Sequence, residues 1–147
     1  MITKGMNLPN EDHVMRYVPW TKLRRDEDEN VIGFLPHAFE LRQEEQFLSV
    51  NWLEYFSGDR DNRIRDSVKM FRKIRSVGKK SAFGIGNVGQ IKEICSANGA
   101  QVRIVYEPEA NNQAHSAIRR LPRDDLSLLE ALAAEAFLEL VPNVDVQ

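Results

Sequence analysis

The chain has 147 residues, 42% of them hydrophobic and 29% charged, which is the composition of one globular domain of ordinary size. The sequence therefore predicts a single domain over residues 1–147, with a loose polar segment over residues 1–10. The formal net charge of -2 favours neither nucleic-acid nor membrane binding by the chain as a whole. The single cysteine, Cys95, excludes an intramolecular disulfide, and we interpret it as a small buried apolar residue.

The ends and the apolar runs of the chain bear on its location. The first residues contain no apolar stretch typical of a signal peptide, and no run approaches the length of a membrane span. We therefore expect a cytoplasmic protein with no membrane partner. No cysteine or histidine pair has the spacing of zinc ligands, so we predict no metal site, and we expect no bound cofactor.

The first third of the chain predicts strands and one hairpin. A β-prone segment over residues 13–18 ends at Pro19. Residues 21–25 and 31–35 are interpreted as hairpin arms joined by an acidic tip. This tip lacks the glycine and the alternate oxygen ligands of a calcium loop, so we interpret it as a solvated turn. Residues 38–42 predict another short strand, and residues 47–56 predict a strand that continues as strand or helical turn.

The remaining elements alternate between helix and strand. A helix at about 61–77 is predicted by apolar residues three or four positions apart, and Gly78 ends it. A strand at 81–85, a helix at 88–98 and a strand at 101–106 predict one crossover. Residues 115–121 predict a last strand, and an amphipathic helix at about 124–140 ends before Pro142. The fold class is therefore α+β (mixed α/β), with a small mixed sheet and one β-α-β crossover.

A glycine-rich segment lies between a predicted strand and a predicted helix. Gly84, Gly86 and Gly89 match the pattern G-x-G-x-x-G, and Glu107 ends the next predicted strand. In dinucleotide-binding units this pattern places a pyrophosphate on the helix N-terminus and an acid on the ribose. The first strand is short, however, and too few residues follow Glu107 for the rest of that fold. We favour a closely packed turn and keep nucleotide binding as the alternative.

Basic residues are concentrated between Arg60 and Lys80, where nine stand against two acids. Four of them share the side of the predicted helix away from its apolar stripe: Arg65, Lys69, Arg72 and Lys73. Such a row can follow phosphates on a nucleic acid. It can equally be solvated, or face the acidic segment from Asp124 onward, which holds six acids and no base, or contact a protein partner.

The chain has three histidines, and two of them open predicted strands. If these strands are neighbours, His13 and His115 converge with Arg16 and Tyr17 in one pocket. That arrangement suits acid–base chemistry on a phosphodiester or a ribosyl group. The alternative is that each histidine is a structural hydrogen-bonding group.

Polar residues also interrupt the apolar run over residues 48–56. Ser49, Asn51 and Glu54 lie between leucine, valine and aromatic residues. Polar groups embedded in a core are either satisfied structurally or placed for a ligand, and we favour the structural interpretation.

Three short patterns resemble a scattered group of small bacterial proteins without an assigned activity. They are F-x-L-R from Phe39, L-S-V-N-W-L-E from Leu48 and A-H-S-x-I from Ala114. The resemblance implies a bacterial, cytoplasmic, self-contained domain and assigns no catalytic residue. We expect a binding or accessory module that contacts nucleic acid or a protein partner from the same operon through its basic helix. The alternative is an enzyme that uses His13, Arg16, Tyr17 and His115.

Overall fold

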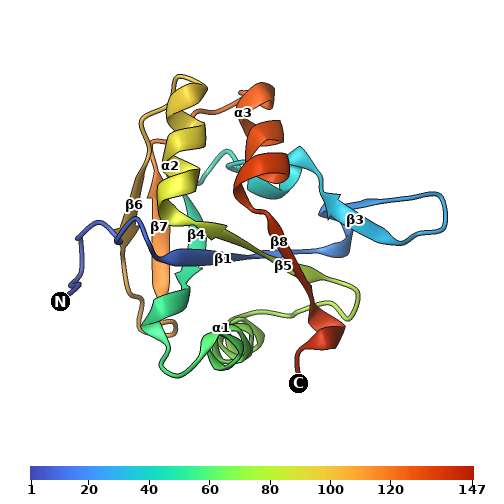
Figure 1. Ribbon diagram of the computed structural model, residues 1–147, viewed down its shortest axis with the longest axis horizontal. Helices are drawn as coiled ribbons and strands as arrows, with labels where there is room; N and C mark the ends of the chain where they lie inside the picture. Colours follow the sequence, from blue (N-terminus) through green and yellow to red (C-terminus); the bar gives the residue numbers. More distant parts are fainter.

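The computed structural model describes all 147 residues, and most of its strands form one six-stranded sheet (Figure 1). The strand order is β6-β7-β4-β1-β5-β8, and every neighbouring pair is antiparallel. The strands are β1 (His13–Val18), β4 (Phe47–Trp52), β5 (Ala82–Asn87), β6 (Arg103–Tyr106), β7 (His115–Arg119) and β8 (Glu139–Pro142). A separate hairpin of β2 (Leu23–Arg25) and β3 (Val31–Phe34) projects from one end of the sheet.

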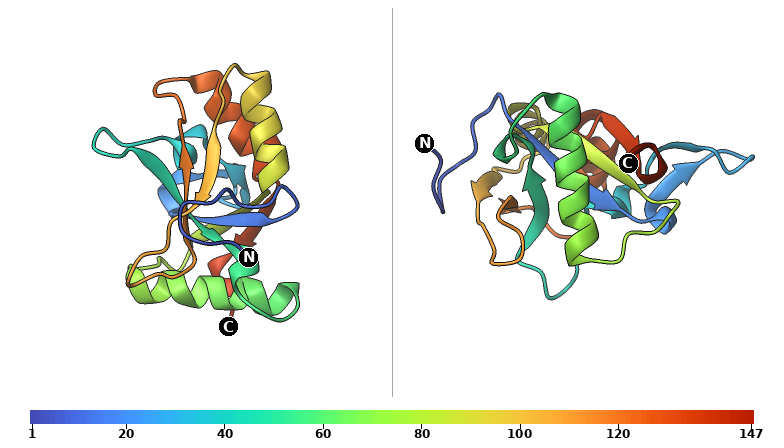
Figure 2. Two further views of the ribbon diagram at one scale, coloured as in Figure 1. Left: turned by 90° about the vertical axis from the view of Figure 1, so that its left-hand side faces the viewer. Right: turned by 90° about the horizontal axis from the view of Figure 1, so that it is seen from below.

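Helices cover both faces of this sheet. α1 (Arg60–Ile74) crosses one face, while α2 (Val88–Ala97) and α3 (Leu126–Ala131) pack on the other (Figure 2). α3 continues as a π-helical turn over Leu132–Ala136. No helix is both long enough and apolar enough to span a bilayer.

The α+β class is confirmed, with one difference in the connectivity. β5, α2 and β6 follow one another as predicted, and β5 and β6 run in the same direction. They are not neighbours, because β1, β4 and β7 lie between them. The predicted mixed sheet is corrected to an antiparallel one, because no two neighbouring strands are parallel, and the crossover spans three strands.

Local capping explains where the two longer helices begin. The side chain of Asp59 accepts a hydrogen bond from the backbone N–H of Asn62 at the start of α1. Asn87 does the same for Gln90 at the start of α2. These are the bonds by which aspartate and asparagine favour a helix N-terminus. Both helices were predicted, and α1 ends at Ile74, three residues before the predicted end.

The hairpin is confirmed, and its acidic tip is a turn held by one side chain. The carboxylate of Asp26 accepts hydrogen bonds from the backbone N–H groups of Asp28 and Asn30, each at 2.9 Å. These bonds lower the pKa of Asp26. An aspartate that bonds its own following backbone is typical of such turns.

The prediction of a C-terminal helix over residues 124–140 is wrong at its C-terminal end. Helical backbone ends at Ala136, and residues 139–142 form β8 on the free edge of β5. The prediction ran too far because Phe137 and Leu140 continue the apolar spacing of the helix. Pairing with an open sheet edge satisfies the backbone of this segment instead.

Two further segments differ from the sequence interpretation. Residues 38–42 form no strand: Pro36–Phe39 is a 3-10 turn that begins with a proline. The N-terminal segment, expected to be loose, lies along the edge strand β6. There Gly5 N–H donates to Tyr106 at 2.8 Å, and Leu8, which is buried, donates to Ile104 at 2.9 Å.

The sheet separates two apolar cores of unequal size. The larger lies under α2 and α3 and contains 26 buried residues, among them Cys95. Burial raises the pKa of the Cys95 thiol to about 11, which agrees with a structural cysteine. The smaller core has six residues, including Met15, Phe71 and Phe83, and lies under α1. Part of the α1 face is therefore left to polar side chains.

Candidate functional site

The sheet splits between β1 and β4, and a guanidinium occupies the split. Only Val14 and Met15 of β1 pair with β4, although β1 pairs with β5 along its whole length. Where β4 diverges, Arg16 donates from Nε to the carbonyl of Ala38 at 2.7 Å and from Nη1 to the carbonyl of Ser49 at 2.9 Å. The side chain thus supplies donors where the neighbouring backbone is missing.

No carboxylate pairs with Arg16. No acidic oxygen lies within 4 Å of its guanidinium, and its third nitrogen, Nη2, makes no hydrogen bond within the chain. Part of the residue remains accessible, but the surrounding protein atoms desolvate the guanidinium and lower its pKa to about 10. The charge of Glu45 acts on it only from beyond ion-pair distance; because buried charges in proteins are usually paired, the unbonded Nη2 is available to an anion.

Two adjoining cavities open at this point, and four residues line both: Arg16, Tyr17, Ser49 and Arg75. The first, of about 210 Å³, lies between α1 and the strands and is also lined by Asn112 and His115. The second, of about 350 Å³, extends toward Lys22 and Arg42. We call the two together the Arg16 cleft.

The charge of the second cavity is positive. Its lining contains four cations, namely Arg16, Lys22, Arg42 and Arg75, and two carboxylates, those of Glu40 and Glu45. Glu45 and Arg42 engage each other: Oε1 of Glu45 accepts from the backbone N–H of Arg42 at 2.7 Å and lies 3.4 Å from its Nε, which is also 3.5 Å from Glu44. Burial, followed by the charges of Arg16 and Arg42, lowers the pKa of Lys22. The cleft therefore favours an anionic occupant.

A serine and a histidine are hydrogen-bonded at the wall of the cleft. Nε2 of His115 lies 3.1 Å from Oγ of Ser49, and Nδ1 lies 2.7 Å from the carbonyl oxygen of Glu107. His115 is buried, whereas Ser49 is exposed. The pair joins neighbouring strands, because Ser49 belongs to β4 and His115 begins β7.

A buried amide network holds the region behind this pair. Asn112 donates to Asn51 at 2.7 Å, and Asn51 donates to the hydroxyl of Ser67 on α1 at 3.2 Å. All three side chains are buried. A fully satisfied polar network fixes one arrangement of its members, so it ties α1 and the loop before β7 to β4.

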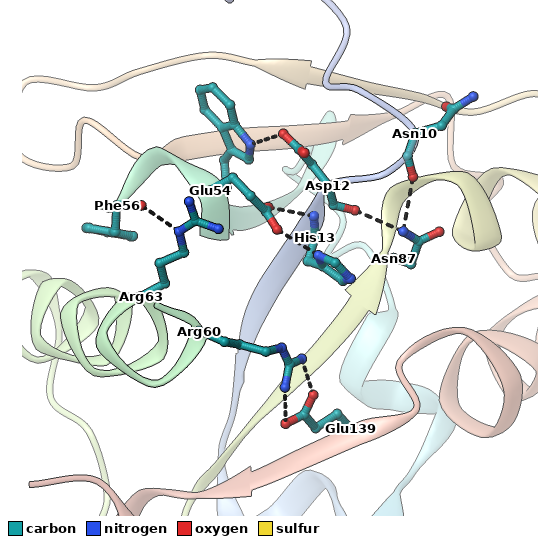
Figure 3. Close-up of polar contacts among 10 residues, drawn as sticks. Asn10, Asp12, His13, Glu54, Phe56, Arg60, Arg63, Asn87 and Glu139 are labelled. Carbon is teal, nitrogen blue, oxygen red and sulfur yellow. Dashed lines mark hydrogen bonds and ion pairs between the residues drawn. The ribbon is translucent and has the colours of Figure 1, made fainter. Parts of the chain in front are cut away.

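The structure brings three of the four candidate catalytic residues together. Arg16, Tyr17 and His115 line one cavity, and His13 does not border it; His13 lies beside Glu54 (Figure 3). Its backbone N–H and its Nδ1 both contact Glu54 at 2.7 Å, beside an Asp12 that accepts from Trp52. β4 separates the strands of His13 and His115. The two histidines therefore do not share the cleft, and the partner of His115 is Ser49.

The four basic residues of α1 that were candidates for nucleic-acid contact fall into two groups. Arg65, Lys69 and Lys73 are exposed. Arg72 is directed at the C-terminal segment, where its guanidinium donates to Asn143 at 2.8 Å and to the carbonyl of Val146 at 2.9 Å. No acidic side chain after Asp124 forms an ion pair with any of these four basic residues. One such pair exists nearby, between Arg60 and Glu139 (Figure 3).

The three motif glycines meet neighbouring atoms closely. Gly84 and Gly86 lie inside β5, not in a turn, and Gly89 lies in the first turn of α2. A Cβ atom on Gly84 would lie 2.9 Å from Phe34, and one on Gly89 would lie 3.1 Å from the backbone oxygen of Asn10. Close packing thus accounts for these glycines. Glu107 is bonded to Arg119 and lies on β6's side of the sheet, away from β5.

The ion pair of Glu107 predicts an acid-sensitive contribution to stability. The hydrogen bond from Arg119 lowers the pKa of Glu107, so the pair stabilises the fold above the ordinary glutamate pKa and this contribution disappears as pH falls through the lowered value. Because the pair is partly exposed, we expect Glu107→Gln to cost about 1 kcal/mol or less at pH 7. Urea unfolding at pH 7 and at pH 3 measures the change.

The expected result is a difference between wild type and Glu107→Gln that shrinks at pH 3. Glu130→Gln is the control, because Glu130 is exposed and forms no ion pair. A difference of the same size at both pH values would contradict the assignment.

Sequence reasoning missed some members of the cleft. Arg75, Glu109 and Asn112 carried no pattern that distinguished them, because each lies at the end of an element or in a loop. Ser49 and Asn51 did stand out in the sequence, because they are polar residues within an apolar run. The structure contains no cluster of three or more His, Cys, Asp or Glu side chains that could hold a metal ion.

Comparisons with known proteins give no assignment. No protein-family model, no curated protein and no solved structure matches the chain. The resemblance to a group of small bacterial proteins therefore stays a prediction.

Proposed function

We propose that the protein binds a small ligand that carries a carboxylate or a phosphate, and that the Arg16 cleft is its site. The observation that carries this proposal is the guanidinium of Arg16, which is desolvated, lacks a carboxylate partner and leaves Nη2 unbonded. A guanidinium presents donors in a planar fork that suits both kinds of oxyanion. Nε and Nη1 are held by backbone carbonyls, so the fork is fixed before the ligand arrives.

The surroundings of Arg16 support the same proposal. Arg75 lies over the ring of Tyr17 at 4.7 Å and borders both cavities. Lys22 adds positive charge on the open side, together with Arg42, whose charge is partly offset by Glu44 and Glu45. A field of one sign raises the local concentration of an oppositely charged ligand.

Calorimetry and thermal unfolding test the proposal with three probes: inorganic phosphate, succinate and ADP. We expect at least one of them to bind and to raise the melting temperature as its concentration rises. Arg16→Met keeps the aliphatic stem and removes the fork, and should weaken binding about tenfold or more, as the loss of a hydrogen bond to a charged group does. The phosphate and succinate arms distinguish the two oxyanions.

The control is the triple variant Arg65→Glu, Lys69→Glu, Lys73→Glu, whose sites lie outside the cleft. It should keep the ligand dissociation constant within a few-fold. Because Arg16→Met leaves two carbonyls without a donor, Arg75→Met serves as a second, more exposed variant and should also weaken binding. No binding of any probe at millimolar concentration, or equal binding by Arg16→Met, would overturn the proposal.

A second candidate function rests on the exposed face of α1. Arg65, Lys69 and Lys73 form no ion pair with an acid of the chain, so this surface is free to contact phosphates of a nucleic acid. The protein would then be an accessory module in the bacterial cytoplasm, acting beside a partner from the same operon. The same triple variant decides this: salt-sensitive binding of an oligonucleotide must be lost in it.

A further inference from the structure

The hydrogen bonds of His115 fix which nitrogen carries its proton in the neutral ring. A carbonyl oxygen only accepts, so Nδ1, at 2.7 Å from the oxygen of Glu107, is the donor. Nε2 is then unprotonated and accepts from the hydroxyl of Ser49 at 3.1 Å. This is the tautomer that a general base needs toward a serine hydroxyl.

Groups on the far side of the ring would stabilise the charge that His115 gains. The carbonyl of Glu107 orients the imidazole, and a carboxylate oxygen of Glu109 lies 3.9 Å from Nδ1. The ring of Phe47 packs edge-on against the imidazole, with the centroids 5.6 Å apart. A base held by a third group is the arrangement that activates a nucleophile.

Ser49 and His115 differ in their exposure to solvent, as a nucleophile and its base do when the nucleophile meets the substrate first. His115 is 5% exposed, while Ser49 is exposed and lines both cavities of the cleft. A ligand in the cleft therefore meets the hydroxyl directly, and Nε2 of His115, whose ring also borders the first cavity, lies behind that hydroxyl. Arg16 is adjacent, since its Nη1 lies 2.9 Å from the carbonyl oxygen of the same serine.

We infer that Ser49 is a nucleophile activated by His115, and that the protein hydrolyses small carboxylic esters whose acyl part carries a second acidic group. Oγ of Ser49 attacks the carbonyl carbon while its proton moves to Nε2 of His115. The bond to the alkoxide breaks, and the alkoxide takes the proton from Nε2 and leaves as an alcohol. An ester now joins the acyl group to Ser49.

Water completes the cycle by the same route. It gives a proton to Nε2 as its oxygen attacks the acyl carbon, and Oγ leaves and regains the proton from Nε2. The products are one carboxylic acid and one alcohol. This inference rests on the proposed function for the substrate's second acidic group, which the guanidinium of Arg16 holds beside the reacting ester.

The experiment uses an organofluorophosphonate and two nitrophenyl esters. Attack by Ser49 on the fluorophosphonate forms an Oγ–P bond and releases fluoride, which leaves an adduct that mass spectrometry of peptides assigns to one residue. Release of nitrophenol is compared for mono-4-nitrophenyl succinate, which is anionic, and 4-nitrophenyl acetate, which is neutral. We expect the adduct on Ser49 and faster turnover of the succinate ester.

Three variants separate the roles. Ser49→Ala should abolish adduct and turnover while it keeps succinate binding. His115→Gln should slow adduct formation by about 100-fold or more, which is the usual contribution of a general base, and circular dichroism checks its fold. Ser76→Ala is the control, because Ser76 is exposed and does not line the cleft.

The outcomes distinguish this inference from the proposed function. Succinate binding by wild type without adduct or turnover would overturn the inference and leave the proposed function standing. Unchanged turnover in Ser49→Ala, or an adduct on another residue only, would also overturn it. Equal rates for the two esters together with Ser49-dependent turnover would retain the nucleophile and remove Arg16 from substrate selection.

Discussion

Replacing Phe137 by alanine is expected to lower the free energy of unfolding by about 3–5 kcal/mol, the usual cost of deleting a buried aromatic side chain. Phe137 is 1% exposed and stacks on Phe39 with the ring centroids 4.5 Å apart. It follows the π-helical turn and leads into β8. Its side chain therefore connects the helical layer to the edge of the sheet, and the vacated volume borders several elements.

Urea unfolding measured by tryptophan fluorescence checks this value. The matched control is Leu138→Ala at the next position, where the side chain is 71% exposed and the change should stay within about 0.5 kcal/mol. Both variants introduce alanine between the π-helical turn and β8, so any effect of the helix propensity of alanine is the same in the two. A cost below about 1 kcal/mol for Phe137→Ala would mean that the surroundings collapse into the space.

Several elements could be predicted because their signals are local. The β-prone run that ends at Pro19, the capping aspartate before α1 and the acidic hairpin tip each act within a few residues. The end of the last helix could not be predicted in this way. Residues 139–142 become a strand because the edge of β5, more than fifty residues earlier in the chain, is available to them.

The cleft depends on pairings between distant segments. Arg16 enters it because β4 leaves β1 after two paired residues and continues beside β7. Ser49 meets His115 because the register of β4 on β7 places His115 opposite Asn51, two residues along the strand. Periodicity shows which residues share a face of a strand but not which strands are neighbours. The sequence therefore indicated the residue types, while their partners came from the topology.

The location of His13 illustrates the same limit. Its position at the start of β1 suggested convergence with His115, since both open strands. One strand separates them, and the carboxylate of Glu54 takes both donors that His13 offers. The histidine that faces the cleft instead uses a backbone carbonyl, a partner that no sequence pattern reveals.

Replacing Gly86 by valine is the second large expected effect, with a cost at or above the upper end of the range of about 1–3 kcal/mol that overpacking usually has. A Cβ atom there would lie 2.9 Å from the backbone oxygen of Ala136 and 3.0 Å from a methyl carbon of Ile91. The oxygen belongs to the π-helical turn and has no side-chain freedom with which to retreat. Branching at Cβ adds two more carbons to the same space.

The control, Gly33→Val in β3, separates packing from strand propensity, because no atom lies within 4 Å of a Cβ atom at Gly33. It should change the free energy of unfolding by about 0.5 kcal/mol or less, measured by urea unfolding beside Gly86→Val.

Gly86→Val also tests the interpretation of the G-x-G-x-x-G pattern as a nucleotide site. If the motif binds a nucleotide, substitution at Gly86 should abolish stabilisation by NAD or ATP while the protein remains folded. If packing alone requires the glycine, stability falls, and any stabilisation by NAD or ATP is the same in Gly86→Val as in the wild type.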